Sequence, residues 1–247
     1  LVLVDLDSVF LPVTTVVIVF DAGMVNLTMM DATEDSVVSQ VESLDMIPRE
    51  PDSVVFIGHD YFATADEGDL DGGSRGFTIY DAANGSVVYT SGNLLEHLVA
   101  SIGHYPEARS ENKGNEPEGI TYSEFGDEKL LFVLSERSSV IFVFDVSDVT
   151  DPVYKQVLPT TNAPEGIVAI PTRNLIAVAA ESDDRQGKIR ASIGIYEVTE
   201  LNALYPSVVS DDRPDGSPIP FAALSGLACG GMLQCIAFLF HPLTEHL

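Results

Sequence analysis

Acidic residues recur at matched places along the chain, and these are the residues whose types and spacing could do chemistry. A Pro-Glu-Gly turn at residues 117–119 returns at residues 164–166, so Glu118 and Glu165 hold equivalent positions. The apolar segment after each turn ends in another acid, and an earlier, degenerate copy begins at Pro51. This makes a second set of acids equivalent: Glu67, Glu136 and Glu181. Carboxylates that come together repel one another, so they require a cation, a basic side chain or a raised pKa.

Two interpretations of this acidic cluster stay open. In the first, basic side chains pair with the acids and join neighbouring repeats; the available partners are Arg49, Arg109, Lys113 and Arg137. In the second, a cation such as Ca²⁺ neutralises the carboxylates, because a metal ion offsets the repulsion among them. For this second case the candidate catalytic residues are Glu118, Glu165, Glu136 and Arg137.

An acidic, glycine-rich loop at residues 67–72 provides a second candidate for metal binding. Its acids alternate before a glycine, as in the first half of a calcium-binding loop. The twelfth position is Thr78, which cannot supply a bidentate carboxylate, so a solvated turn is the alternative. Hard oxygen ligands favour Ca²⁺ over a transition metal. The candidate metal ligands are Glu67, Asp69, Asp71, Glu118, Glu165 and Glu181.

Other catalytic and cofactor motifs are absent from the sequence. Ser225 lacks the flanking glycines of a nucleophile elbow and is interpreted as a turn residue. The sequence has neither a P-loop nor a Gly-x-Gly-x-x-Gly motif, so no organic cofactor is expected.

The spacing of the repeat predicts the elements that position the acids. Pro117 and Pro164 lie 47 residues apart, the length in which four short strands make one propeller blade. We therefore predict an all-β fold, a β-propeller of YVTN/WD40-like blades that forms a partial ring. Apolar residues at helical spacing predict one short inserted helix near 92–102. The predicted blades are about 1–48, 49–113, 114–160, 161–205 and a partial blade at 206–228, followed by a divergent apolar tail at 229–247.

The charge balance excludes several classes of partner. The chain has 12 basic and 38 acidic residues, a formal net charge of −26. Nucleic-acid phosphates and anionic membrane surfaces would be repelled. The charge suits a soluble protein in salty or extracellular surroundings, or one that holds cations. We expect a monomer that neither binds nucleic acid nor inserts into a membrane.

Several long runs of residues resemble the choice-of-anchor I family. The longest is His104-Tyr-Pro-Glu-Ala-Arg-Ser-Glu-Asn-Lys-Gly-Asn-Glu-Pro-Glu-Gly119. Further runs lie at 47–52, 63–69, 73–79, 135–137, 164–166, 173–175, 180–184, 206–213 and 216–226. The resemblance covers about residues 44–228 and extends to the related "esterase-like activity of phytase" domain. Residues 229–247 depart from the family pattern, which indicates a truncated or frame-shifted reading.

The resemblance implies an exported bacterial protein, located outside the cell, in the periplasm or on the cell surface. Two functions follow as expectations, and a fragment with no activity is the third alternative. One is a phytase-like, Ca²⁺-dependent phosphoric ester hydrolase, with a phosphate ester as its ligand. The other is a non-catalytic binding or adhesion module that takes a cell-surface ligand.

Overall fold

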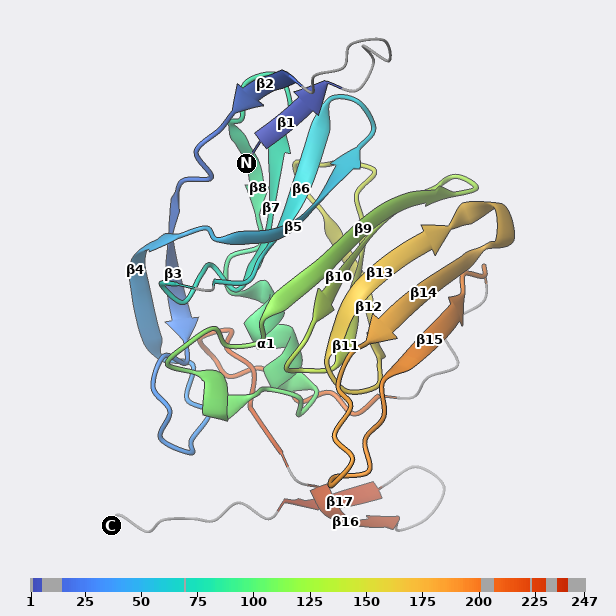
Figure 1. Ribbon diagram of the computed structural model, residues 1–247. Coiled ribbons are helices and arrows are strands. Elements are labelled where there is room, and N and C mark those ends of the chain that lie inside the picture. Colours follow the sequence, from blue (N-terminus) through green and yellow to red (C-terminus); the bar gives the residue numbers. More distant parts are fainter. Residues whose placement is uncertain are drawn as a thin grey trace.

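The computed structural model describes residues 2–5, 15–68, 70–200, 207–222, 224–229 and 235–239. Within them the chain is predominantly β, arranged in several antiparallel sheets (Figure 1). Three of these sheets have two strands each. Their strands are β1 (Val2–Asp5) with β2 (Thr15–Val19), β3 (Met24–Met30) with β4 (Glu42–Pro48), and β16 (Leu224–Cys229) with β17 (Cys235–Leu239).

Three larger sheets follow one another along the sequence, and in each the strands pair in chain order. The first contains β5 (Pro51–Ile57), β6 (Tyr61–Asp66), β7 (Gly76–Asp81) and β8 (Val87–Thr90). The second contains β9 (Pro117–Phe125), β10 (Glu128–Ser135), β11 (Val140–Asp145) and β12 (Val153–Pro159). The third contains β13 (Pro164–Ile170), β14 (Leu175–Ala180) and β15 (Ser192–Glu197).

The first strands of these sheets lie side by side, β5 against β9 and β9 against β13 (Figure 1). Because both faces of the β9–β12 sheet are covered, β10 and β11 are continuously apolar instead of alternating. Leu131 and Val133 of β10 pack toward the β5–β8 sheet, in a cluster with Phe77 and Ile79. The side chains between them on β10, such as Phe132, pack on the other face against the β13–β15 sheet.

One helix, α1 (Leu94–Ser101), interrupts the strands between the first two sheets. Its buried side chains include Leu95 and Val99, which join the same apolar cluster as Phe77. Short 3-10 turns follow at Glu107–Arg109 and Pro171–Arg173. No helix among the described residues is long and apolar enough to cross a membrane.

The prediction of an all-β fold with one short helix near 92–102 is confirmed at this level. The described residues form separate sheets, and none of these sheets closes on itself. A complete propeller requires the sheets to form a ring around an axis, and such a ring is not shown by the described residues.

Substitution of Phe142 measures how much the packing between sheets contributes to the free energy of unfolding. It is fully buried in the cluster between the β5–β8 and β9–β12 sheets. We expect Phe142→Ala to lower the free energy of unfolding by about 3–5 kcal/mol, because it removes apolar contacts and leaves a cavity. Urea denaturation measures this loss. Val153→Ala, at a position 56% exposed on β12, should change it by less than about 0.5 kcal/mol.

Candidate carboxylate site

The strand register places the acids of successive repeats at corresponding positions. Pro51, Pro117 and Pro164 each open a first strand and pair with the last residue of the second strand. The residue that follows the second strand is an acid in every sheet: Glu67, Glu136 and Glu181. The residue after each proline is also an acid: Asp52, Glu118 and Glu165. Each of the three sheets thus brings two acids to the same end.

The later two repeats share a backbone feature at this end. The residue before the proline has a left-handed φ, 50° at Glu116 and 56° at Ala163. Its carbonyl accepts a hydrogen bond of 2.9 Å from the backbone N–H of Glu136 or Glu181, respectively. A residue before proline normally prefers extended φ and ψ, so this shared exception indicates that the two turns have the same geometry.

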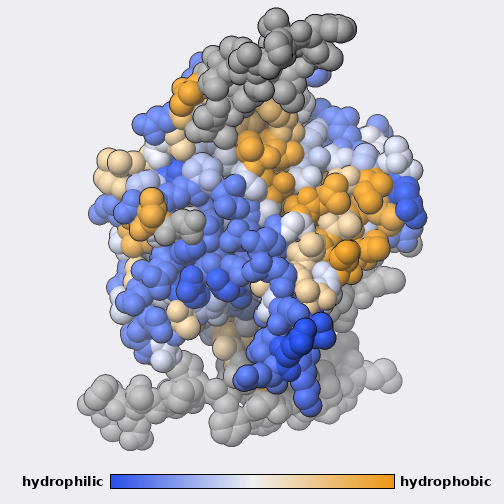
Figure 2. All heavy atoms as spheres, viewed as in Figure 1, coloured by the Kyte–Doolittle hydropathy of each residue, from blue (hydrophilic) through white to orange (hydrophobic). Residues whose placement is uncertain are grey.

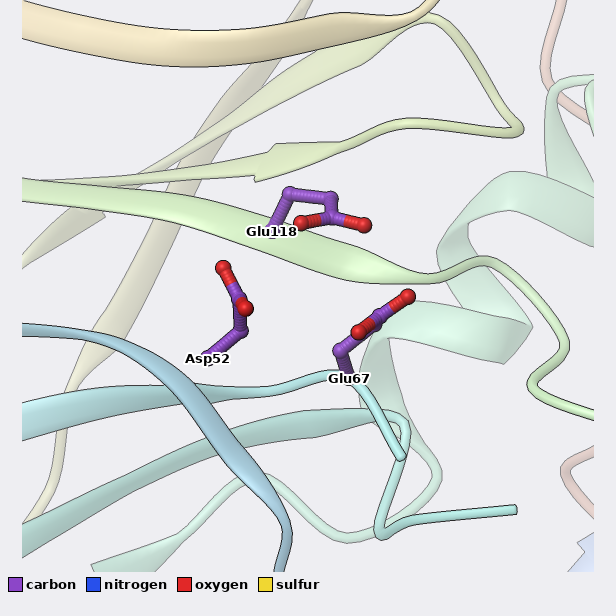
Figure 3. A group of neighbouring side chains, drawn as sticks. All are labelled: Asp52, Glu67 and Glu118. Carbon is purple, nitrogen blue, oxygen red and sulfur yellow. The ribbon is translucent and has the colours of Figure 1, made fainter. Parts of the chain in front are cut away.

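Asp52, Glu67 and Glu118 form the first of two carboxylate groups. They come from β5, the loop after β6 and β9, and their side chains turn toward one another (Figure 3). One oxygen from each lies within 4.8 Å of the others. Glu67 and Glu118 are buried, whereas Asp52 is exposed, so the group is open to solvent on one side.

Glu116, Glu118 and Glu136 form the second group, again with oxygens within 4.8 Å of one another. All three are buried. Glu118 belongs to both groups and therefore lies at the centre of the site. Glu165 and Glu181 lie at the exposed rim, close enough for Glu165 to feel the charges of Glu181, Asp52 and Glu67.

Basic side chains neutralise part of this charge. Lys113 pairs with Glu67 at 2.5 Å, and Arg109 pairs with Glu116 at 2.5 Å. Arg137 contacts the second carboxylate oxygen of Glu116 at 3.1 Å and Glu136 at 2.9 Å. No basic side chain of the described residues makes an ion pair with Glu118. The cluster therefore keeps an excess of carboxylates around its most central member.

Burial and repulsion from neighbouring carboxylates raise the pKa values of Glu118, Glu136 and Glu165. Burial, followed by the hydrogen-bonded Glu67 carboxyl, raises the pKa of Glu118 to about 9. Burial, followed by the hydrogen-bonded Glu116 carboxyl, raises the pKa of Glu136 to about 7. Burial and then the Glu181 charge raise the pKa of Glu165. In the absence of a cation, Glu118 therefore holds a proton at neutral pH.

A buried polar network fixes the segment that supplies Glu116 and two of the basic residues. Arg75 is almost fully buried and donates to the backbone carbonyls of Ser110, at 2.7 Å, and Asn112, at 3.2 Å. Asn115 donates its side-chain N–H at 2.6 Å, and its backbone N–H at 2.8 Å, to the buried Glu96 carboxylate of α1. These bonds hold the loop from α1 to β9 in one position, and with it Arg109 and Lys113.

The glycine-rich loop after Glu67 lies beside a polar hollow of about 340 Å³. The Glu50 carboxylate accepts hydrogen bonds from the backbone N–H groups of Leu70 and Asp71. These bonds hold the loop against the start of β5. The hollow opens between this loop and the segment that follows the 3-10 turn at Glu107–Arg109. It is lined by Gly68, Leu70, Asp71, Gly72, Arg109, Glu111, Asn112 and Lys113.

Only some of the predicted ligands come together. Glu67 and Glu118 share the first group, and Glu136 joins Glu118 in the second. Glu165 and Glu181 stay at the rim, and Asp71 belongs to neither group. Asp69 lies outside the described residues. The predicted calcium-binding loop, which includes Asp69, therefore stays a prediction.

The two groups also contain Asp52 and Glu116, which were not predicted from the sequence as site residues. Asp52 follows the proline of the degenerate repeat and is therefore equivalent to Glu118 and Glu165. Alignment of the three repeats would have predicted it as a site residue. Glu116 lies outside that alignment, because the matching residue in the next repeat is Ala163. Among the basic candidates, Arg49 was expected near the acids, but its guanidinium donates to the carbonyls of Ala22 and Met24.

The raised pKa of Glu118 predicts a pH-dependent stability. Its pKa rises from 4.5 to about 9 on folding, so the folded state binds the extra proton. Without divalent cations, the contribution of this proton to the free energy of unfolding is complete below pH 4.5 and is lost as the pH rises toward 9. In Glu118→Gln the free energy of unfolding should therefore fall less steeply with rising pH than in the wild type. The difference in slope should be at most about 1.4 kcal/mol per pH unit.

Urea denaturation between pH 5 and 9 with a chelator present measures this difference. Glu128→Gln, which changes an exposed carboxylate on β10, is the matched control and should follow the wild type. Parallel pH profiles for the wild type and Glu118→Gln would contradict the assigned proton.

Comparison with known proteins gives a match to one family model over part of the chain. Residues 71–149 match the model of the choice-of-anchor I domain. A search of curated proteins gives no match. Among solved structures, the chain is similar to a functionally unknown protein from Desulfotomaculum acetoxidans DSM 771, with 15% sequence identity and a TM-score of 0.37. The alignment covers 71% of this chain and 50% of the other.

The family match supports the choice-of-anchor I part of the sequence resemblance, over a shorter range than residues 44–228. The matched segment includes α1, the loop with Arg109 and Lys113, and the start of β9 with Glu118. The phytase-like part of the resemblance stays a prediction. The match to a choice-of-anchor I domain indicates an exported or surface-anchored protein.

Proposed function

We propose that this chain is a Ca²⁺-dependent binding module of an exported or cell-surface protein, and that its sheets are successive propeller blades. The observation that carries the proposal is the position of Glu118. This residue is 8% exposed, faces Asp52 and Glu67, and makes no ion pair with a basic side chain of the described residues. A cation at this point would replace the proton that the site otherwise requires.

The donor set favours Ca²⁺ over other metals. The first group offers three carboxylates and no His or Cys ligand. Ca²⁺ takes six to eight oxygen ligands in flexible geometry, so carboxylates, backbone carbonyls and water can complete its shell. Asp52 is exposed, which leaves a side of the ion open to water or to a ligand. The first group is thus suited to joining an anionic ligand to an acidic protein through the metal.

The arrangement of the sheets supports the propeller part of the proposal. Two sheets have four antiparallel strands in chain order, and their first strands are neighbours. In a propeller, the innermost strands of adjacent blades lie side by side around an axis. Stacking of this kind brings the acid-bearing ends of the sheets to one mouth.

A phosphoric ester hydrolase is the second candidate, and one observation favours it. The polar hollow with Arg109 and Lys113 adjoins the first carboxylate group through the Lys113–Glu67 pair. A phosphate group in this hollow would meet Arg109 and Lys113 as well as the acids Asp71 and Glu111, and a bound Ca²⁺ would offset the acids and polarise a phosphoryl oxygen. Glu118, Glu165, Glu136 and Arg137 remain the candidate catalytic residues.

Calcium titration with thermal melting tests the proposed metal. At a hundredfold excess over its dissociation constant, Ca²⁺ should stabilise the wild type by about 2.7 kcal/mol. Asp52→Asn and Glu118→Gln should lose most of this gain, whereas Glu128→Gln, at an exposed position, should keep it. An unchanged melting temperature at millimolar Ca²⁺ would exclude the metal site.

A phosphate-ester assay separates the two candidate functions. If the chain is a hydrolase, cleavage of a chromogenic phosphate monoester should require Ca²⁺, and Glu118→Ala and Glu165→Ala should each lower kcat/KM at least tenfold. If it is a binding module, Ca²⁺ stabilises the protein but no cleavage occurs. Activity that survives both substitutions would show that these two residues are not catalytic.

A further inference from the structure

The longest connection between paired strands of the three larger sheets lies between β14 and β15, at residues 181–191. Figure 1 shows this loop extending away from the acid-bearing end of the β13–β15 sheet, and Figure 2 shows it, in the same view, as a strongly hydrophilic projection. Every residue from 183 to 191 is exposed. The loop is therefore open to solvent over most of its length.

Few interactions hold the loop in place. The Asp184 carboxylate accepts a hydrogen bond from the backbone N–H of Gln186 at 2.8 Å, and the Asp184 carbonyl accepts one from that of Ile189 at 2.9 Å. Arg190 pairs with Asp183, and both side chains are exposed. Residues 183–191 contribute no side chain to either buried apolar cluster of the described residues. A segment with so few buried contacts opens locally at a small cost in free energy, which exposes its backbone to an enzyme.

Three basic residues lie close together in this loop: Arg185, Lys188 and Arg190. The whole chain has only 12 basic residues, so the loop holds a quarter of them. Among the described residues, Arg190 is the one of the three that makes an ion pair. Serine proteases of the trypsin class bind a Lys or Arg side chain in a pocket with an acidic group at its base, so they require a basic side chain that is free to enter.

The other nine basic residues also lie among the described residues, and five of them are buried or bound to carboxylates. These five are Arg49, Arg75, Arg109, Lys113 and Arg137. Entry into a protease pocket would require them to break those contacts. Cleavage after any of the five therefore requires the surrounding structure to open first.

The remaining four basic residues lie where the chain does not fit a protease. Lys129 and Lys155 are within β10 and β12, whose backbone is bonded to neighbouring strands. Arg173 is in the short turn between β13 and β14, which cannot extend while those strands stay paired. Arg213 precedes Pro214, whose ring fixes φ and lacks the N–H of an ordinary peptide bond. A protease binds several consecutive substrate residues in extended form, and among the basic sites of the chain the β14–β15 loop alone offers them.

We propose that the β14–β15 loop is a processing site for an extracellular trypsin-class protease, which cuts the chain after Arg185, Lys188 or Arg190. The reaction is hydrolysis: water adds across the peptide bond, leaving a carboxylate on the basic residue and an amine on the residue after it. The match to a choice-of-anchor I domain indicates an exported or surface-anchored protein, which lies where such proteases act. The proposal goes beyond Ca²⁺ binding and does not depend on it.

The cut would leave the two parts of the chain associated. β15 stays paired with β14 from Leu175–Glu197 to Ala180–Ser192. Tyr196 of β15 also donates its O–H to the Pro159 carbonyl at 2.7 Å and packs against the apolar cluster shared with the β9–β12 sheet. Processing at this loop is therefore a nick that preserves the sheets, and it does not release the C-terminal part.

Limited trypsin digestion of the folded chain, followed by intact-mass spectrometry, locates the first cut. We expect two fragments whose boundary lies after Arg185, Lys188 or Arg190. Size-exclusion chromatography in buffer should give the elution volume of the uncut chain, and the fragments should separate only in urea. A first cut after any basic residue outside the loop, or fragments that separate in buffer, would overturn the proposal.

A triple variant, Arg185→Gln with Lys188→Gln and Arg190→Gln, tests the dependence on the basic side chains. Its first cut should be at least about tenfold slower than that of the wild type, because cleavage elsewhere requires packed structure to open. Arg173→Gln, at an exposed basic residue in the turn after β13, is the matched control and should leave the rate unchanged. Matched circular dichroism spectra and melting temperatures show that the variants are folded, and the position of the wild-type cut decides the question if one is not. An unchanged first-cut rate in the folded triple variant would contradict the proposal.

Discussion

Repulsion among carboxylates is the constraint on which the candidate site depends. The repeat brings one acid from each turn and one from each second-strand end to the same end of successive sheets. Ion pairs with Arg109, Lys113 and Arg137 offset part of the charge, but Glu118 has no such partner among the described residues. The site therefore requires either a proton, which is what the raised pKa of Glu118 describes, or a cation.

The apolar pattern of the strands is the second constraint, and it explains why the acids meet. A sheet buried on both faces must have a neighbour on each side, so the β9–β12 sheet holds β5 and β13 next to β9. Asp52 and Glu118 lie near the starts of β5 and β9, and packing between these sheets brings them together. The same packing rule leaves one face of the β13–β15 sheet without a neighbour among the described residues.

Buried polar residues around α1 fix the loop that supplies basic side chains to the acidic site. Arg75, Glu96 and Asn115 are buried together and hold the loop that leads into β9. Buried polar groups of this kind are costly unless they are paired, so the loop that presents Arg109 and Lys113 has little freedom to move. This rigidity matters for a cation site, because a preorganised set of charges loses less conformational entropy when a ligand binds.

The sequence by itself determined the class of fold and the equivalence of the acids. Apolar strands and a 47-residue spacing were sufficient, because strand formation and register within a sheet depend on local pattern. Only the tertiary structure decided which acids form a group. It added Asp52 and Glu116, left Glu165, Glu181 and Asp71 outside both groups, and directed Arg49 to backbone carbonyls. Distances between side chains on different sheets depend on how the sheets pack, and no local spacing in the chain contains that information.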